Sequence, residues 1–319
     1  MERLYGDLAW LWPVLSPVED YVEESDIFAR LLSEAALGPV RSLLHLASGG
    51  GHIDHRLKET FDVTGVDRSE AMVGLARDLN PDVEYEVADM RSVRLGRSFD
   101  AVLIDDGVVY ATTPEDLRAV FETAFVHLRP GGSMLVYVEY EPGTFRQSET
   151  TSKRRVGGGI DLVYIENTFD PDPSDTVVET TYVYLVRRDG ALTVEVDRHI
   201  CGMFPLDIWR ELLDGAGFSW TERRFEHSEH GSGEEQPLFV CTRPTGAAGR
   251  ATRGPRDARG PARTTAPAAR TASTGARRTG RSTMIPGSRG STGRPRRSRA
   301  DTTARRPGSR RSSSSPRSS

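Results

Sequence analysis

The sequence predicts an α/β protein with a mainly parallel seven-stranded sheet, an antiparallel β insertion and a disordered C-terminal tail. Three observations lead to this fold class. Short apolar segments alternate with helical patterns up to about residue 142, which is typical of parallel βαβ units whose sheet is covered on both faces. Apolar and polar residues then alternate at period two, as in antiparallel strands with one wet face. From residue 245 almost no apolar residue remains to form a core.

The first region contains five expected strands and the helices between them. Short apolar runs place the strands, and apolar residues at helical spacing place the helices. The last of these helices stops at the turn sequence RPGG. The expected strands are residues 40–47, 61–66, 83–87, 99–104 and 133–139, and the expected helices are residues 52–59, 69–79 and 115–128.

The pattern changes after Pro142. Residues 160–169, 176–188 and 191–204 alternate apolar and polar side chains, and the turn sequences DPDPSD and RRDG separate them. Three strands of an antiparallel meander are therefore expected. A helix at residues 206–213 and two last strands, at residues 219–225 and 237–241, complete the expected fold.

The net charge of −4 is the sum of two oppositely charged regions. Residues 245–319 hold 19 Arg and 2 Asp, a balance of +17, so that the residues before them carry −21. The acidic region does not favour nucleic acid or anionic membranes, whereas a basic tail can bind polyanions. Two interpretations account for the Arg-rich composition of residues 245–319: a natural solvated tail, or an unintended reading frame of GC-rich DNA. Specific nucleic-acid binding ranks third, because the tail has no aromatic side chain to stack on a base.

The cysteines and the N-terminus indicate the compartment. Cys201 and Cys241 form neither a metal-ligand spacing nor a disulfide framework, so no metal is expected and a reducing compartment is indicated. The first residues, MERLYGDLAW, lack the apolar run of a signal peptide, and no apolar run approaches the length of a membrane span. A soluble, cytoplasmic protein is therefore expected.

The segment SLLHLASGGGHIDHRL, residues 42–57, leads from a strand through three glycines into a helix. A bare backbone lets a ligand approach closely, and the helix N-terminus offers unpaired N–H groups. Gly49 and Gly51 fill the first two places of the dinucleotide fingerprint G-x-G-x-x-G, but the third place is Asp54, which counts against NAD or FAD. No lysine followed by Ser or Thr is present at the turn, which excludes a P-loop.

Acidic residues follow the next two expected strands. Asp67 ends a strand about 20 residues past the glycine turn, where an acid can bind ribose hydroxyls. Asp89 and Met90 follow the third strand, and an acid with a thioether is a reasonable clamp for an adenine. These residues indicate a nucleoside ligand that does not require a pyrophosphate.

Four segments in this order resemble the class I S-adenosylmethionine (SAM)-dependent methyltransferases: SLLHLASGGG, VTGVDRSEAMVGLAR, YEVADMRSVRLGRSFDAV and FVHLRPGG. Within that family they are similar to the branch of amino-sugar N-methyltransferases, over residues 5–244. The resemblance implies a Rossmann-like methyltransferase fold. It divides the chain into an N-terminal helical cap (residues 1–40), a SAM-binding core (41–142), a substrate-covering antiparallel insertion (143–205), the C-terminal part of the core (206–244) and the tail (245–319).

The resemblance implies roles for residues at the adenosine end of the cofactor. Asp67 matches the acid that binds the ribose hydroxyls, with a plain helix-capping acid as the alternative. Met72 matches the residue that packs on the adenine, and a core position is the alternative. Asp89 matches the acid that faces the adenine amine, and Met90 offers its backbone N–H.

The resemblance also implies residues at the methionine end and in the cap. Ala47, Gly49 and Gly51 occupy the glycine-loop positions that pass under the methionine part of SAM. Tyr5 and Tyr21 match aromatic residues of the cap that closes over the cofactor. The tryptophans interpreted as packing residues are Trp10, Trp12 and Trp220.

Three residues are candidates for contact with the reacting groups. Asp105 and Tyr110 lie in the segment after the fourth strand, which faces the methyl group in the family. His199, in the insertion, is a candidate general base or a structural histidine. A neutral amine needs no strong base before it attacks, so this set mildly favours an amine over a hydroxyl acceptor.

Two positions depart from the family pattern. Ala47 replaces the usual first glycine. His45 stands where the family usually has an acid that helps to fix the amino group of SAM, and a protonated histidine cannot take that role. Asp105 or Asp106 is then expected to substitute for it, or else the protein has poor cofactor affinity or no activity.

The sequence therefore predicts a SAM-dependent methyltransferase that acts on a small-molecule acceptor, an amine being favoured, and that forms a homodimer through the insertion as the branch does. No membrane partner is expected, and nucleic acid only through the tail. A non-catalytic SAM-fold protein and a nicotinamide-dependent oxidoreductase are the two alternatives.

Overall fold

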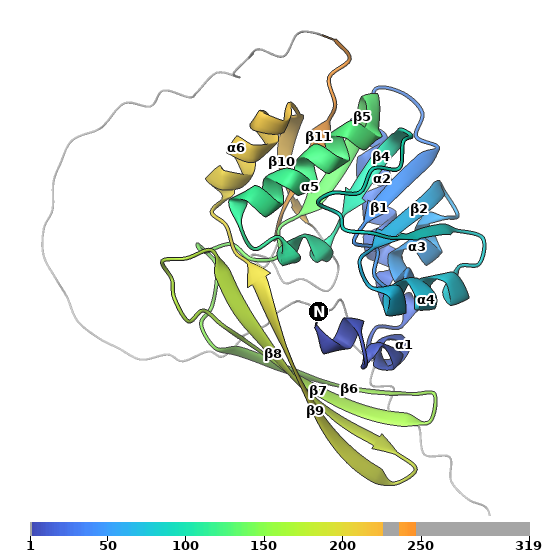
Figure 1. Ribbon diagram of the computed structural model, residues 1–319, viewed down its shortest axis with the longest axis vertical. Helices are drawn as coiled ribbons and strands as arrows, with labels where there is room; N and C mark the ends of the chain where they lie inside the picture. The colour runs from blue at the N-terminus through green and yellow to red at the C-terminus, as the bar shows by residue number, and fades with distance from the viewer. Residues whose placement is uncertain (1, 226–235, 247–319) are drawn as a thin grey trace, which may run out of the picture. The chain divides into compact units, whose positions relative to one another are not determined.

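The computed structural model describes residues 2–225 and 236–246. Its central sheet consists of β1 (Ser42–Leu46), β2 (Asp62–Asp67), β3 (Glu84–Val87), β4 (Phe99–Ile104), β5 (Leu128–Tyr137), β10 (Ser219–Phe225) and β11 (Gln236–Thr242). The strand order is β10-β11-β5-β4-β1-β2-β3 (Figure 1). The first five strands in the chain pair in parallel, whereas β11 pairs antiparallel with β5 and with β10. This sheet confirms the expected mainly parallel seven-stranded architecture.

Five α-helices accompany the sheet: α2 (Val22–Ala35), α3 (His52–Leu57), α4 (Glu70–Leu79), α5 (Pro114–His127) and α6 (Leu206–Ala216). Local signals start two of them. The Ser69 hydroxyl accepts a hydrogen bond from the backbone N–H of Met72 at the start of α4, and Thr113 caps α5 in the same way just before Pro114. Side chains of this type at the N-cap satisfy N–H groups that have no partner within the helix.

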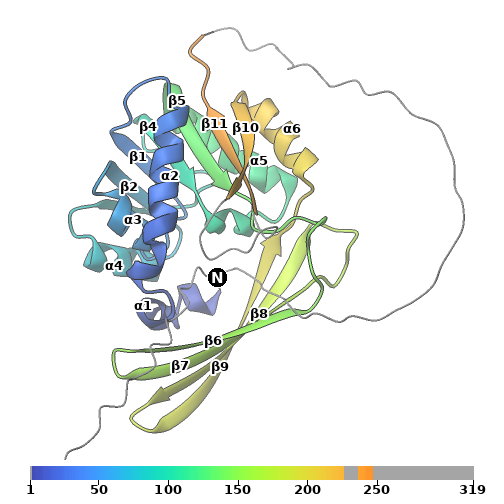
Figure 2. The ribbon, with the colours of Figure 1, turned by 180° about the vertical axis from the view of Figure 1, so that it is seen from behind.

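The helices cover both faces of the sheet because its strands are apolar on both sides. Leu44 and Val102 pack with α5 and α6 on one face, and Leu43 and Leu103 pack with α2 and α3 on the other. Figure 1 shows α5 and α6 in front of the sheet, and Figure 2 shows α2 in front of the opposite face. Successive side chains of a strand point to opposite faces, so each strand contributes to both cores.

One expected boundary is wrong. The RPGG sequence was expected to be a turn before a strand at residues 133–139, but β5 already begins at Leu128 and ends at Tyr137. The register shifts there, since Phe99 pairs with Leu128 and Ala101 with Ser133. The turn residues therefore form an irregularity within the strand, because Leu128 still reaches a partner on β4.

A second, antiparallel sheet has the order β6-β7-β8-β9 and consists of β6 (Glu149–Gly157), β7 (Ile160–Phe169), β8 (Val177–Arg188) and β9 (Ala191–Gly202). The last three were expected. The sequence did not reveal β6, because ETTSKRRVG has a single aliphatic residue and forms an edge strand. The inner face of this sheet is buried and carries Leu162, Tyr164, Tyr182 and Tyr184.

The N-terminal segment packs against that inner face. It contains three short 3-10 helices, η1 (Arg3–Tyr5), η2 (Ala9–Leu11) and η3 (Val18–Tyr21), and the four-residue α1 (Trp12–Leu15). Leu4, Leu8, Leu11 and Leu15 share one hydrophobic cluster with the four-stranded sheet. The segment therefore packs against the four-stranded sheet on one side and borders the carboxyl ends of the parallel strands on the other.

The expected tail from residue 247 onward lies outside the described residues. Within the described part of the chain, no helix is both long enough and apolar enough to cross a membrane.

Candidate active site

A cavity lies where the carboxyl ends of β1 to β4 meet the N-terminal segment. With its open mouth it comprises about 890 Å³ of empty space. Its position at the ends of parallel strands is where open α/β sheets bind ligands.

The glycine turn after β1 forms one wall of the cavity. Ala47, Gly49 and Gly51 all have left-handed φ angles, of 61°, 54° and 75°. Gly51 cannot be replaced without strain, because an added Cβ would lie 2.6 Å from the Tyr85 hydroxyl and 2.8 Å from the Asn80 amide nitrogen. Gly51 itself does not line the cavity. It shapes the turn, whereas Ala47 and Gly49 face the cavity.

Asp67 closes the cavity beside the turn. One carboxylate oxygen accepts the Gly49 N–H at 2.8 Å, and the other accepts the Ser69 N–H at 2.8 Å. Burial raises the pKa of Asp67, while these two N–H groups oppose the shift. Each oxygen keeps a further lone pair, so the carboxylate can accept two ligand hydroxyls.

Asp89 and Met90 lie at the next strand end, after β3. The Asp89 carboxylate accepts hydrogen bonds from the Arg91 backbone and guanidinium, and this pairing with Arg91 lowers the pKa of Asp89. Arg91 also pairs with Asp116 at 2.9 Å. The Met90 backbone N–H donates no hydrogen bond to any residue within 2–225 and 236–246. That free donor and the Asp89 carboxylate line the same end of the cavity.

Aromatic side chains of the N-terminal segment form the opposite wall. Tyr5 and Tyr21 line the cavity as expected. Trp12, expected from the sequence to be a packing residue, lines it too, and its indole N–H donates to Nδ1 of His52 at 2.9 Å. Burial lowers the pKa of His52 to about 4, so its ring is neutral and can accept this bond. Nothing in the local sequence of His52 or Trp12 indicated their proximity.

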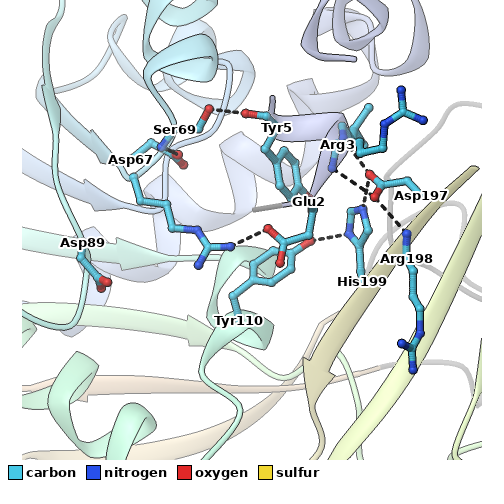
Figure 3. Close-up of polar contacts among 12 residues, drawn as sticks. Glu2, Arg3, Tyr5, Asp67, Ser69, Asp89, Tyr110, Asp197, Arg198 and His199 are labelled. Carbon is cyan, nitrogen blue, oxygen red and sulfur yellow. Dashed lines mark hydrogen bonds and ion pairs between the residues drawn. The ribbon is translucent and has the colours of Figure 1, made fainter. Parts of the chain in front are cut away.

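Arg68 is a second cavity residue that the sequence did not single out. Its guanidinium lies 5.5 Å from the ring centre of Tyr110 and pairs with the Glu2 carboxylate. Figure 3 shows the Glu2 carboxylate beside Tyr110, with Tyr5 above it. The Ser69 hydroxyl donates to the backbone oxygen of Tyr5. These contacts tie the N-terminal segment to the residues that follow β2.

Met72 is not brought to the cavity. It is fully buried in α4 and is absent from the cavity lining. This position agrees with the alternative interpretation of Met72 as a core residue, because a side chain with no exposed surface cannot contact a ligand.

His45 lies under the cavity between two carboxylates. Its Nδ1 is 2.7 Å from Asp54, and its Nε2 is 3.3 Å from Asp105. Burial favours the neutral ring, but the two carboxylates outweigh it and raise the pKa of His45 well above its usual value. Asp54 in turn accepts the Tyr85 hydroxyl at 3.0 Å. The histidine is therefore held as an imidazolium.

Two further acids surround this group. Burial, followed by the nearby Asp105 carboxylate, raises the pKa of Asp106 well above its usual value. Burial also raises the pKa of Glu24, with contributions from both Asp105 and Asp106. Asp105 and Asp106 line the cavity, whereas Glu24 lies behind it. Because their pKa values are raised, Asp106 and Glu24 take up a proton more readily than an exposed acid does.

Tyr110 belongs to η4 (Asp106–Tyr110) and connects the cavity to the second sheet. Its hydroxyl lies 2.8 Å from the Tyr5 hydroxyl and 2.8 Å from Nδ1 of His199. Nε2 of His199 is 2.9 Å from the Asp197 carboxylate. Figure 3 shows this chain from Tyr110 through His199 to Asp197. His199 does not line the cavity, but it contacts Tyr110 and Tyr5, which do.

Asp197 orients the His199 ring. Burial would raise the pKa of Asp197, but the His199 ring and the N–H groups of Leu4 and Arg3 lower it to about 2. Nε2 of His199 faces this carboxylate, and Nδ1 faces the Tyr110 hydroxyl. The Tyr110 hydroxyl itself donates to the Tyr5 hydroxyl.

Comparison with known proteins agrees with this geometry. Residues 43–132 match the family described as methyltransferase domain. The dTDP-3-amino-3,4,6-trideoxy-alpha-D-glucopyranose N,N-dimethyltransferase of Streptomyces venezuelae is 38% identical over 129 residues, which are 40% of this chain and 54% of that protein. The match thus spans about half the length of that relative. The dTDP-3-amino-3,6-dideoxy-alpha-D-glucopyranose N,N-dimethyltransferase of Streptomyces fradiae is 25% identical over 67% of this chain and 84% of its own length.

Solved structures extend the likeness to the whole fold. Streptomyces venezuelae DesVI has a TM-score of 0.63 and 26% identity, and covers 74% of this chain and 95% of its own. The sugar N-methyltransferase KedS8 from Streptoalloteichus has a TM-score of 0.62 and 25% identity, over 75% and 92% of the two chains.

The fold and the matched domain are those of SAM-dependent methyltransferases. Residues 43–132 belong to the methyltransferase domain family, and the chain resembles the amino-sugar N-methyltransferase branch. This confirms the family, the Rossmann-like methyltransferase fold and the cofactor class expected from the sequence.

The residues present fit SAM. The cavity lining runs from Asp89 past Asp67 and Gly49 to Asp105, which gives polar groups for each part of a nucleoside with an amino acid arm. Asp67 has lone pairs free for two hydroxyls, and the unused Met90 N–H offers a donor to an adenine ring nitrogen. At the other end, Asp105 supplies a carboxylate for a cationic group.

Proposed function

We propose that this protein uses SAM to methylate the amino group of a small-molecule acceptor, and that the acceptor is a nucleotide-linked amino sugar. The names of both Streptomyces relatives specify N,N-dimethylation of a dTDP-linked amino sugar. The observation that supports the reaction best is the order of groups along one sheet edge.

That order follows the strand order β3-β2-β1-β4. Asp89 follows β3, Asp67 ends β2, the glycine turn follows β1, and Asp105 follows β4. An adenine, a ribose and a methionine arm fit these positions in the same sequence. A cofactor held in this order would present its methyl group toward η4, where Tyr110 lies on the cavity wall.

SAM supplies an activated methyl group, so the chain itself has to orient the acceptor and exclude water. The N-terminal segment is suited to exclude water, because Tyr5, Trp12 and Tyr21 all line the cavity opposite the strands. Positioning of this kind can lower a barrier by about 7–11 kcal/mol.

The amine becomes positively charged when it accepts the methyl group, and its proton then needs an acceptor. The Tyr110 hydroxyl is the polar group on the cavity wall that connects to a base, through the 2.8 Å contact with Nδ1 of His199. Asp197 stabilises the imidazolium that forms. We assign Tyr110 to contact with the acceptor and His199 to proton acceptance through Tyr110, whose hydroxyl turns from Tyr5 to Nδ1 of His199 for this step.

The two alternatives are less well supported. For an oxidoreductase, the third fingerprint position would be a glycine, yet here Asp54 is fully buried and bonded to His45 and Tyr85. A non-catalytic protein was considered because of His45. His45 contacts two carboxylates, so the replacement of the usual acid by histidine does not leave the site without an acid and does not by itself argue against turnover.

A homodimer through the four-stranded sheet is part of the same proposal. The outer face of this sheet carries two neighbouring cross-strand rows of aliphatic residues, Ile165–Val183–Val196 and Val163–Leu185–Val194. Val194 and Val196 are more than half exposed. Two ion pairs, Arg154–Asp161 and Arg198–Glu179, flank the rows, so that the rim carries both positive and negative charges. An apolar centre with a mixed-charge rim suits pairing with a second copy of the same face.

The cytoplasm remains the predicted compartment, supported by two free and buried cysteines.

Binding and turnover test the function in two steps. Calorimetry of the full chain with S-adenosylhomocysteine and with NAD is expected to give binding of the first alone. Asp67→Asn should weaken that binding, whereas Asp78→Asn, an exposed acid on α4, should not. Transfer of labelled methyl from SAM to dTDP-amino sugars then tests the acceptor. Binding of NAD, or binding of neither ligand, would contradict the proposal.

A further inference from the structure

We infer that Asp105, supported from below by His45 and Asp54, is the carboxylate that binds the α-ammonium group of the methionine arm of SAM. The inference rests on the proposed function. It identifies the residue that takes over the task of the acid usually found at the position of His45.

Asp105 lies at the correct end of the cavity. With adenine near Asp89 and ribose at Asp67, the methionine arm has to extend past the glycine turn toward β4. The η4 segment that follows β4 packs directly on that turn, since an added Cβ on Gly107 would lie 2.5 Å from the Cβ of Ala47. An arm that extends past Gly49 along the cavity therefore reaches Asp105, which lines the cavity beside this contact.

The Asp105 carboxylate has one oxygen to spare. Its Oδ1 lies 3.3 Å from Nε2 of His45, and its Oδ2 has no hydrogen-bond partner among the residues that the structure describes. The residue is 6% exposed and lines the cavity. A carboxylate held by a cation on one oxygen and open to a cavity on the other is suited to bind a second cation.

Asp106 is the competing candidate, and its environment disfavours it. The His45 ring contacts Asp105, whereas burial and the adjacent Asp105 carboxylate raise the pKa of Asp106 well above its usual value, which favours the neutral form of Asp106. Glu24 has a raised pKa for the same reasons and does not line the cavity.

The charge of the group also accounts for a histidine at this position. One imidazolium between two carboxylates has a net charge of −1, which equals that of a single acid at position 45, so His45 with Asp54 and Asp105 can replace such an acid. The acids that act on His45 include Asp54 from α3, Asp105 after β4, Asp67 from β2, Glu24 from α2 and Asp106 from η4. In this arrangement Asp105 presents a carboxylate to the cavity.

Two ligands separate the arms of the cofactor. S-adenosylhomocysteine carries the amino acid arm, whereas 5′-methylthioadenosine keeps the adenosine and the thioether but lacks that arm. Calorimetry of the full chain should show that Asp105→Asn weakens S-adenosylhomocysteine binding about 10- to 100-fold, the loss expected for a charged hydrogen bond. Binding of 5′-methylthioadenosine should not change, which also demonstrates that the variant is folded.

Asp106→Asn is the matched control, because it makes the same substitution at the adjacent acid, which also lines the cavity. It should leave both affinities unchanged within about twofold, well below the effect expected at Asp105. His45→Gln should weaken S-adenosylhomocysteine selectively, since Asp105 loses its cationic support.

An unchanged ratio of the two affinities in Asp105→Asn would overturn the inference alone. A selective loss in Asp106→Asn instead of Asp105→Asn would overturn it as well, by assigning the ammonium group to Asp106. Absence of S-adenosylhomocysteine binding to the wild-type chain would overturn the proposed function and the inference with it.

Discussion

Replacement of Gly51 by alanine is expected to destabilise the protein by about 2–5 kcal/mol, a figure that combines two costs. The first is conformational. Gly51 has a φ of 75° at the N-terminus of α3, and an L-residue in the left-handed region costs about 1–2 kcal/mol.

The second cost comes from two buried side chains. The new Cβ would lie 2.6 Å from the Tyr85 hydroxyl and 2.8 Å from the Asn80 amide nitrogen, so both have to move. The Tyr85 hydroxyl donates to Asp54, and the Asn80 amide donates to the Tyr85 hydroxyl and to the Gly51 carbonyl. Loss of one such bond to a buried charged group costs about 1–3 kcal/mol.

Urea unfolding of the full chain, followed by tryptophan fluorescence, measures the difference. Gly74→Ala is the matched control, because Gly74 lies in α4 with a helical φ and no atom within 4 Å of its added Cβ. That variant should be stabilised by about 0.5–1 kcal/mol through helix propensity. If Gly51→Ala unfolds within about 0.5 kcal/mol of the wild type, the turn does not need its glycine and the argument is wrong.

Three further predictions concern His45, His199 and the outer face of the second sheet. The folded pKa of His45 is raised, so its stabilisation is complete below about pH 6.5 and is lost as pH rises through the folded pKa. Between about pH 6.5 and the folded pKa of His45, the free energy of unfolding of the wild type should fall by about 1.4 kcal/mol per pH unit relative to that of His45→Gln in urea unfolding. Parallel curves of unfolding free energy against pH would contradict the charge assignment. His199→Gln should lower kcat about 100-fold at neutral pH with unchanged S-adenosylhomocysteine affinity and partial recovery at high pH, whereas an unchanged kcat would exclude the proton path. Val194→Lys should convert dimers to monomers in sedimentation while Val126→Lys on α5 does not, and monomeric wild type would refute the dimer.

Residues 42–139 show how far local patterns reach. The glycine turn, Asp67 and Asp89 each follow a strand at a readable position, and parallel strands place their carboxyl ends at one edge. These residues therefore lie along one sheet edge, in the strand order β3-β2-β1, and local spacing was enough to predict that they line the same cavity. The edge strand β6 did not, because its side chains are mostly polar on both faces.

The contacts that decide the chemistry join segments far apart in the chain. Tyr110 and His199 are 89 residues apart and meet only because the second sheet packs against η4. The sequence by itself determined the fold class, the turn and the acids at the strand ends, since these depend on local spacing. The tertiary structure alone decided that His45 lies between Asp54 and Asp105 and that Trp12 reaches the cavity, because burial and partners set the charge of a side chain and its access to a ligand.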